Sequence, residues 1–394
     1  MANRSSRRTF MQTAALTAPA VSAAAAAKST SGVYSRLGIR PVINGVGVVT
    51  VLGGSIMPPE VVAAMEEASR HFVPLIDLQK AVGARIAELL HVPGAMVTCG
   101  AASAISVGTS ACISRGDAAI QRQMPDIGGI RHEVVQQKAH HCGYEAQMLM
   151  TGAKIVWVET RRELDAAIND KTAMMFFLNK ADPLGQIKRD EWVRVAKERG
   201  VPTLNDTASD ASPRERLWKY VQDGFDLVIF SGGKAILGPQ ASGLLLGRKD
   251  LIDAAIPCMS PHGGIGRGMK VGKEEMVGLL AAVERYLKVD HAAEMRELED
   301  RVKFMAQTLG KIDGLKPERH VPVIANEVPH LTLEWDESAR KLSSTQVVKL
   351  LQDGDPPIHV QRPGEGKLLI SVWMMRAGEH RIVTRRLQEI FRHA

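Results

Sequence analysis

Short apolar runs alternate with longer stretches of helical periodicity along most of the chain. Helical spacing places Ile86, Leu89 and Leu90 on one face of 78–90, whereas 227–230 is a short continuous apolar run. By these criteria we predict helices at 62–70, 78–90, 100–114, 164–169 and 191–199. We predict strands at 95–99, 154–158, 173–178, 203–205, 227–230 and 243–247. Alternation of this kind predicts an α/β fold with a mostly parallel sheet covered by helices on both faces.

The pattern changes after residue 274, where a long helical segment leads into a region of mixed periodicity. Strands predicted at 330–334 and 367–372 favour a smaller C-terminal α+β domain. The predicted organisation is an N-terminal arm at 29–55, a large domain at 56–270, and an interdomain helix with a small domain at 271–394. In parallel sheets, ligands bind at the carboxyl ends of the strands, so functional residues are expected there.

The first 28 residues differ in composition from the rest of the chain. Arg7 and Arg8 precede a modestly apolar stretch at 13–27 that ends in a run of alanines. This order fits a twin-arginine signal peptide. We therefore predict that 1–28 directs the protein to the periplasm or out of the cell. The alternative is a cytoplasmic protein with an alanine-rich tail.

The charge and composition of the chain also limit the kinds of partner that are expected. The formal net charge is +7, but Arg4, Arg7 and Arg8 contribute to it, and the later basic residues are interspersed with acids. Nucleic-acid binding is therefore not expected. No apolar run after residue 28 approaches the ~20 residues of a membrane helix, so no stable membrane insertion is expected. The four cysteines show no CxxC spacing, and no metal site is predicted.

Small residues follow the predicted strand at 95–99. Gly100, Ala101 and Ala102 pass directly into a predicted helix. A helix N-terminus with accessible backbone amides favours an anion such as phosphate. The alternative is close helix packing, which small residues also permit.

Asp206 and Lys234 follow two further predicted strands. Lys234 comes after Ser231 and two glycines, which clear space around its amine. A desolvated lysine can lose its proton and attack an aldehyde. A buried carboxylate can keep a pyridine nitrogen protonated, so these residues together with a phosphate site fit pyridoxal phosphate. The alternatives are a helix cap at Asp206 and a surface lysine in a glycine turn at Lys234.

Five motifs carry a family resemblance. They are INGVGVVTVLGGSIMPPEV, TCGAASAISVGTSAC, SGGKAILGPQASGLLLGRKDLI, GRGMKVGKEE and GDPPIHV. With them the chain resembles the fold-type-I pyridoxal-phosphate enzymes, in the group that contains bacterial selenocysteine synthase and D-glucosaminate-6-phosphate ammonia-lyase. The resemblance extends from about residue 34 to the end. It implies a large pyridoxal-phosphate-binding domain and a homodimer or larger homo-oligomer.

The resemblance also implies roles for individual residues. Lys234 would bind the cofactor aldehyde covalently and later move the Cα proton, and Asp206 would hold the pyridine N–H. Phosphate binding is implied for Ser231, Gly100, Ala101 and Ala102.

Further residues are expected near the cofactor or the substrate. Fold-type-I enzymes place a flat side chain over the cofactor ring, and His140 is the candidate, with a surface or core histidine as the alternative. Arg267 and Lys270 lie in a glycine-rich segment that in the family often serves the neighbouring subunit's site, and they are expected to bind a phosphate or carboxylate; the alternative is a solvated loop. Arg362 is a lesser candidate for the substrate carboxylate.

The resemblance implies β-elimination on a hydroxylated amino acid or amino-sugar acid, with release of a 2-oxo acid and ammonia. A racemase or an aminotransferase shares the first step of that reaction and is the alternative. Selenium transfer is disfavoured, because no room precedes the core for the tRNA-binding domain of selenocysteine synthase. An inactive, exported cofactor-binding protein is disfavoured by the presence of both Lys234 and Asp206.

Overall fold

The computed structural model describes residues 32–392. By internal contacts the chain forms two units, Met1–Pro41 and Val42–Ala394. The described part of the first unit holds one short helix, α1 (Val33–Arg36). The predicted signal peptide at 1–28 lies outside the described residues and stays a prediction. Between residues 32 and 392, no helix combines the length and the apolar character needed to cross a membrane.

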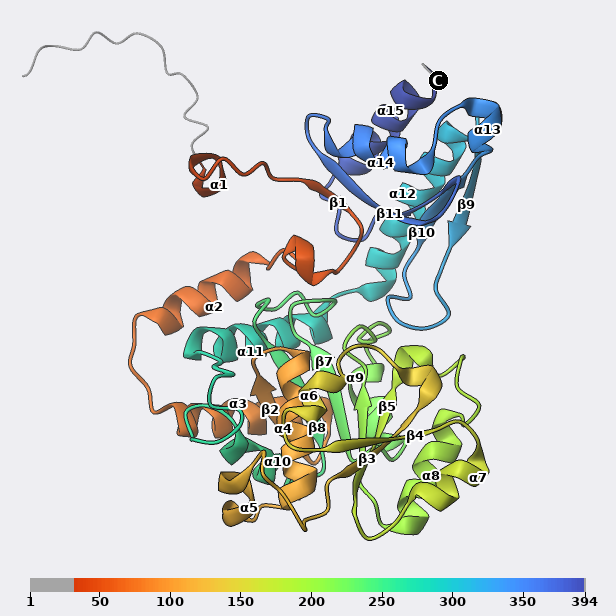
Figure 1. The fold of residues 1–394 in the computed structure, drawn as a ribbon. Helices are drawn as coiled ribbons and strands as arrows, with labels where there is room; N and C mark the ends of the chain where they lie inside the picture. Colours follow the sequence, from red (N-terminus) through yellow and green to blue (C-terminus); the bar gives the residue numbers. More distant parts are fainter. Residues whose placement is uncertain (1–31, 393–394) are drawn as a thin grey trace, which may run out of the picture. The chain divides into compact units, whose positions relative to one another are not determined.

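The second unit contains a seven-stranded sheet in the order β2-β8-β7-β6-β5-β3-β4 (Figure 1). Its strands are β2 (Gly94–Thr98), β3 (Glu133–Gln137), β4 (Lys154–Val158), β5 (Thr172–Leu178), β6 (Thr203–Asp206), β7 (Leu227–Ser231) and β8 (Gly243–Gly247). Strands β3 to β7 pair in parallel, whereas β8 is antiparallel to both β2 and β7. The predicted mostly parallel sheet is confirmed.

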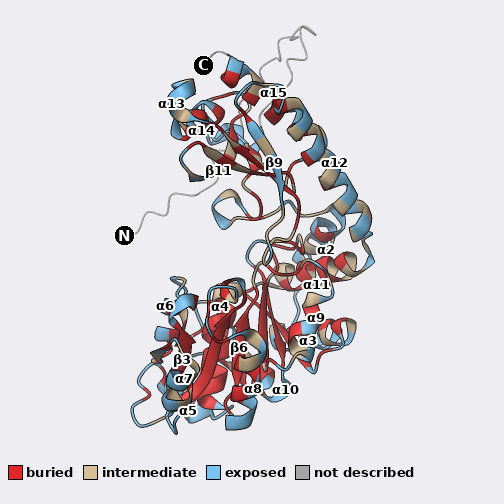
Figure 2. Ribbon diagram, turned by 90° about the vertical axis from the view of Figure 1, so that its right-hand side faces the viewer, coloured by how far each residue is buried: buried red, intermediate tan, exposed pale blue. Residues whose placement is uncertain are grey.

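Helices α2 to α11 accompany this sheet. They are α2 (Pro59–Ser69), α3 (Leu75–Leu90), α4 (Ala101–Ser114), α5 (Ala118–Gln123), α6 (Glu145–Leu149), α7 (Arg161–Ala167), α8 (Arg189–Arg199), α9 (Arg216–Gln222), α10 (Lys249–Ala255) and α11 (Lys273–Lys288). Helix α4 packs along β5 to β8 and is buried over nearly its whole length. Its small residues permit this, since a Cβ on Gly108 would lie 2.6 Å from Leu204 Cδ1. Figure 2 shows the buried strands between helices whose outer surfaces are exposed.

A second, smaller sheet has the order β1-β11-β12-β10-β9. Its strands are β1 (Ile43–Gly45), β9 (Lys316–His320), β10 (His330–Glu334), β11 (Ile358–Gly364) and β12 (Lys367–Ser371), and its helices are α12 (His291–Leu309), α13 (Glu337–Arg340), α14 (Ser344–Gln352) and α15 (Glu379–Arg392). These elements enclose their own hydrophobic core, to which Ile43 contributes from β1. A separate core, which includes residues of α11, fills the larger lobe.

Strand β3 was not predicted, because polar side chains interrupt its apolar pattern. Gln136 and Gln137 are fully buried but hydrogen-bonded: Gln136 Nε2 donates to the His140 carbonyl (2.8 Å), and Gln137 exchanges bonds with the backbone of Ile187 (2.8 and 2.9 Å). A buried amide that makes such hydrogen bonds is tolerated in a core strand. Hydrophobic periodicity alone therefore predicts a loop for this segment.

Candidate active site

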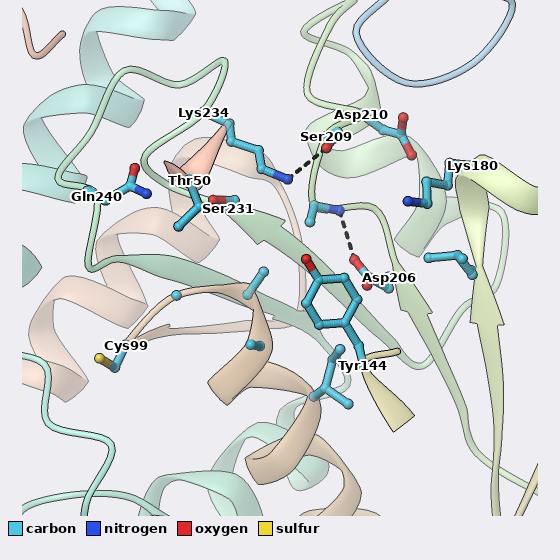
Figure 3. Close-up of a pocket in the computed structure, with 16 residues that line it drawn as sticks. Thr50, Cys99, Tyr144, Lys180, Asp206, Ser209, Asp210, Ser231, Lys234 and Gln240 are labelled. Carbon is cyan, nitrogen blue, oxygen red and sulfur yellow. Dashed lines mark hydrogen bonds between the residues drawn. The ribbon is translucent and has the colours of Figure 1, made fainter. Parts of the chain in front are cut away.

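A cavity of about 400 Å³ lies where strands β5, β6 and β7 end and helix α4 begins (Figure 3). Leu178, Asp206 and Ser231 are the last residues of the three strands, and all three line it. The 3₁₀ turn at Thr50–Leu52 also contributes Thr50 to its wall. Chain segments distant in sequence are thus brought together at the carboxyl edge of the sheet, the position expected for a ligand in such folds.

Lys234 extends into this cavity from the turn after β7. Its Nζ donates a hydrogen bond to Ser209 Oγ at 2.8 Å (Figure 3). Burial lowers the pKa of the Lys234 amine, the nearby Asp206 carboxylate opposes that effect, and Lys180 lowers the pKa further. A lysine with a lowered pKa holds more of the neutral, nucleophilic amine at a given pH. The glycines before it are needed, since a Cβ on Gly233 would lie 2.6 Å from Gln240 Cα.

Asp206 is buried at the end of β6 and lines the same cavity. Its Oδ1 accepts a hydrogen bond from the Ala208 amide at 3.0 Å. Burial raises the pKa of this carboxyl group, and the Ala208 amide, Lys234 and Lys180 partly offset that rise. Such a carboxyl group gains from a cationic partner in the cavity, for example a protonated ring nitrogen.

The first turn of α4 supplies backbone amides to the cavity wall. Gly100, Ala101 and Ala102 line it, and Gly100 has a φ of +86°, in the region that favours glycine. Ser231 faces the same space from β7. Gly243 lets the helix start lie close to β8, since a Cβ there would be 2.6 Å from the Gly100 carbonyl carbon. This arrangement places the N-terminus of a 14-residue helix, which favours an anion, at the cavity wall.

A buried polar network supports the rim beside Asp206. Asn179 Nδ2 donates to Asp210 Oδ2 (2.8 Å) and to the Tyr220 hydroxyl (2.9 Å). Burial raises the pKa of Asp210, and the bond from Asn179 opposes that rise. The segment 206–210 is also held from the smaller lobe, because the Asn326 amide donates to the Ser209 carbonyl (3.0 Å). The loop after Asp206, which carries the Ser209 partner of Lys234, is therefore held by bonds from both lobes.

The structure brings six of the predicted residues to this cavity: Lys234, Asp206, Ser231, Gly100, Ala101 and Ala102. His140 does not line it. The ring is buried, its Nδ1 accepts from the Leu178 amide (3.2 Å), and it stands edge-on to Phe177 at 4.5 Å. Tyr144 is the aromatic residue that lines the cavity (Figure 3).

The three predicted substrate-binding cations lie elsewhere. Arg267 and Lys270 are exposed in the loop before α11, where Arg267 approaches Ser260 Oγ at 3.4 Å. Arg362 is exposed on β11, with one guanidinium nitrogen 3.5 Å from Ser344 Oγ. None of the three lines this chain's own cavity. Their roles stay predictions, and for the first two they concern a neighbouring subunit's site.

Several cavity residues were not predicted. Ser209 and Asp210 follow Asp206 in one loop, Gln240 belongs to the GPQ part of the lysine motif, and Lys180 follows the carboxyl end of β5. Their positions next to strand ends or within a motif could have indicated them. Tyr144 had no such signal. Within 32–392, no three His, Cys, Asp or Glu side chains are grouped so that they could hold a metal ion.

The chain is similar to known proteins in both sequence and structure. The sequence model of the family described as SelA, L-seryl-tRNA selenium transferase, matches residues 42–312. A D-glucosaminate-6-phosphate ammonia lyase of Salmonella typhimurium is 31% identical over 378 residues, which cover 93% of this chain and 99% of the relative. A solved structure of D-glucosaminate-6-phosphate ammonia-lyase matches with a TM-score of 0.81 and 30% identity, covering 93% of this chain and 99% of that one.

Two further similarities differ in kind. A 5'-C-glycyluridine monooxygenase-decarboxylase of a Streptomyces species is 31% identical over 372 residues, 91% of each chain. A serine palmitoyltransferase structure from S. paucimobilis with bound PLP-myriocin has a TM-score of 0.58 at 16% identity, covering 90% of this chain and 88% of that one. The latter shows the shared fold only.

Proposed function

The chain belongs to the L-seryl-tRNA selenium transferase family, and from this premise we propose that it is an ammonia-lyase. Its fold is that of the fold-type-I enzymes, and its cofactor is pyridoxal 5'-phosphate. The proposed substrate is a hydroxylated amino acid or an amino-sugar acid, which loses water by β-elimination. Water then hydrolyses the resulting enamine, through its imine form, to a 2-oxo acid and ammonia.

The cavity residues fit the cofactor. Lys234 offers a half-buried amine of lowered pKa for the aldehyde, and Asp206 offers a buried carboxyl group for the pyridine nitrogen. The first turn of α4 and Ser231 would hold the phosphate. The close approach of that turn at Gly243 keeps its amides at the cavity wall. When bound, pyridoxal phosphate withdraws electrons from the substrate's Cα and so weakens the bonds there.

The protein's own residues would determine which bond of the substrate breaks. Once displaced from the cofactor, the Lys234 amine remains in the cavity and can take the Cα proton of the substrate. The Ser209 hydroxyl, 2.8 Å from Nζ, orients that amine. Asp206 would supply a negative charge for the ring nitrogen of the cofactor and would so favour the withdrawal of electrons from Cα. The hydroxyl group of the neighbouring carbon would leave as hydroxide and take up a proton to become water, which completes the elimination.

The observation that carries the proposal is the end-to-end similarity to an ammonia lyase, combined with a cavity that contains Lys234 and Asp206. The Streptomyces relative is equally similar and is named for another reaction. The reaction type is therefore determined by identifying the products.

The test is product analysis with purified protein saturated with pyridoxal phosphate. Candidate substrates are D- and L-serine, D- and L-threonine, D-glucosaminate and its 6-phosphate. We expect ammonia and a 2-oxo acid in equal amounts from at least one of them. Lys234→Ala should lower the rate by roughly 10³-fold, since it removes the proton acceptor. Lys197→Ala, an exposed lysine on α8, is the control and should be unchanged.

Two outcomes would contradict the lyase proposal. Exchange of the Cα proton in deuterated water without ammonia release would identify a racemase. Accumulation of pyridoxamine phosphate with an amino donor would identify an aminotransferase.

A further inference from the structure

Four charged side chains line the cavity: Lys180, Asp206, Asp210 and Lys234. In the proposed function Lys234 and Asp206 serve the cofactor, and Asp210 is bound to Asn179. Lys180 has no such role. It is exposed, its amine points into the cavity in Figure 3, and within 32–392 its side chain makes no hydrogen bond or ion pair.

We propose that Lys180 binds the carboxylate of the substrate. The inference rests on the proposed function, because it concerns the amino-acid substrate of that reaction. Such a substrate enters with a carboxylate next to the carbon that reacts. A lysine ammonium is a compact charge with three donors that can meet a carboxylate from several directions. In the part of the chain that the structure describes, no arginine lines the cavity.

The backbone around Lys180 is held by hydrogen bonds of its neighbours, so the side chain extends from a fixed base. Lys180 is the middle residue of the 3₁₀ turn η3 (Asn179–Ala181). On one side Asn179 is buried and bonded to Asp210 and Tyr220. On the other side Asp182 donates its amide to the Asn179 carbonyl (3.0 Å), and its Oδ1 accepts from the Arg189 amide (3.1 Å). A binding group on a fixed base loses less freedom when the ligand arrives.

The charge of Lys180 also reaches the reacting groups. It lowers the pKa of Lys234, although burial is the larger cause. A carboxylate paired with Lys180 would offset that positive charge and let the pKa of Lys234 rise. Substrate binding would thereby favour uptake of the Cα proton by Lys234.

Two carbonyl reagents test the inference without any turnover. Aminooxyacetate and methoxyamine both displace Lys234 from the cofactor by forming an oxime, but only aminooxyacetate carries a carboxylate. For each reagent, the second-order rate constant with the protein is measured from the loss of cofactor absorbance. This rate constant is divided by the rate constant of the same reagent with free pyridoxal phosphate, which corrects for the reagent's own reactivity. We expect wild-type protein to favour aminooxyacetate, and Lys180→Met to reduce that preference by roughly tenfold, the effect of losing about 1.4 kcal/mol. Lys180→Arg should retain most of it.

Lys197→Met is the matched control and should keep the wild-type preference. Cofactor absorbance equal to that of wild type shows that each variant is folded and loaded. The inference is overturned if wild-type protein shows no preference for aminooxyacetate, or if Lys180→Met shows the same preference as wild type. Because no product is measured, absence of ammonia release would refute the lyase proposal while leaving this result intact.

Discussion

Burial has opposite effects on the two ionisable side chains at the centre of the cavity. It lowers the pKa of the Lys234 amine and raises that of the Asp206 carboxyl, because in both cases it disfavours the charged form. Each group also stabilises the charge of the other. A cationic ring nitrogen near Asp206 would take over the role of Lys234 as its counter-charge. The amine could then stay neutral, which is the state that reacts with an aldehyde.

His140 provides a pH-dependent prediction at the residue scale. Burial lowers the pKa of this ring to about 4, from an ordinary value of 6.5. Between these values the unfolded chain binds a proton at His140 and the folded chain does not, so stability falls as pH falls from about 6.5 to about 4. The fully buried ring makes this loss on the order of 3 kcal/mol. Urea unfolding from pH 7 to pH 4 should therefore show a smaller decline for His140→Gln than for wild type.

Glutamine can still accept the Leu178 amide bond, so the variant removes the titration with limited loss of contact. His71→Gln, at an exposed position, is the control and should decline as wild type does. Equal slopes for wild type and His140→Gln would mean that the ring is not held neutral in the folded protein.

Helix α4 and strand β8 provide a prediction at the scale of elements. A Cβ on Gly243 would meet the Gly100 and Ala101 backbone at 2.6 to 2.8 Å, so Gly243→Ala must push the first turn of α4 away from the sheet. That turn would hold the cofactor phosphate. We expect the Kd of pyridoxal phosphate to rise by roughly tenfold or more, measured by titrating cofactor-free protein, with overpacking costing about 1–3 kcal/mol of stability.

The control for this change is Gly263→Ala, where an added Cβ meets nothing within 4 Å. Its cofactor affinity should match wild type. An unchanged Kd in Gly243→Ala would show that the start of α4 does not contribute to phosphate binding.

Elements whose side chains follow a clear period were predictable from the sequence. Residues 78–90 fall within α3 and 243–247 coincide with β8, because their burial follows directly from apolar spacing. The strand at 133–137 was not predictable in this way, because two buried glutamines interrupt its apolar pattern and the bonds of Gln137 go to Ile187, which is distant in the chain. At the site, Lys234 and Asp206 were indicated by glycine context and strand ends. Tyr144 was not, because its position depends on tertiary packing alone.

At the scale of the whole molecule, the smaller lobe is hydrogen-bonded to the wall of the cavity. Asn326 of the smaller lobe bonds to Ser209, whose hydroxyl accepts from Lys234. Movement of the smaller lobe would therefore act directly on the segment that orients the reactive amine. The bond from Asn326 joins backbone atoms and the bond to Lys234 joins side chains, so the link depends on both the path of the loop and the Ser209 hydroxyl.

The region between α2 and α3 provides the last prediction, which concerns assembly. Phe72 and Val73 are exposed between the two helices, as are Val62 on α2 and Ile76 on α3, and Phe72 is fully exposed at 105%. A concentration of large apolar side chains on a surface marks an interaction site, and burying one such side chain is worth about 1.5–3 kcal/mol. We expect wild-type protein to sediment with at least twice the mass of one chain, and Phe72→Asp to weaken association by at least about tenfold. Leu350→Asp, on α14 with 42% exposure, is the control and should leave the mass unchanged. A wild-type protein that sediments as a single chain, or a Phe72→Asp variant that assembles normally, would show that this face is not the interface.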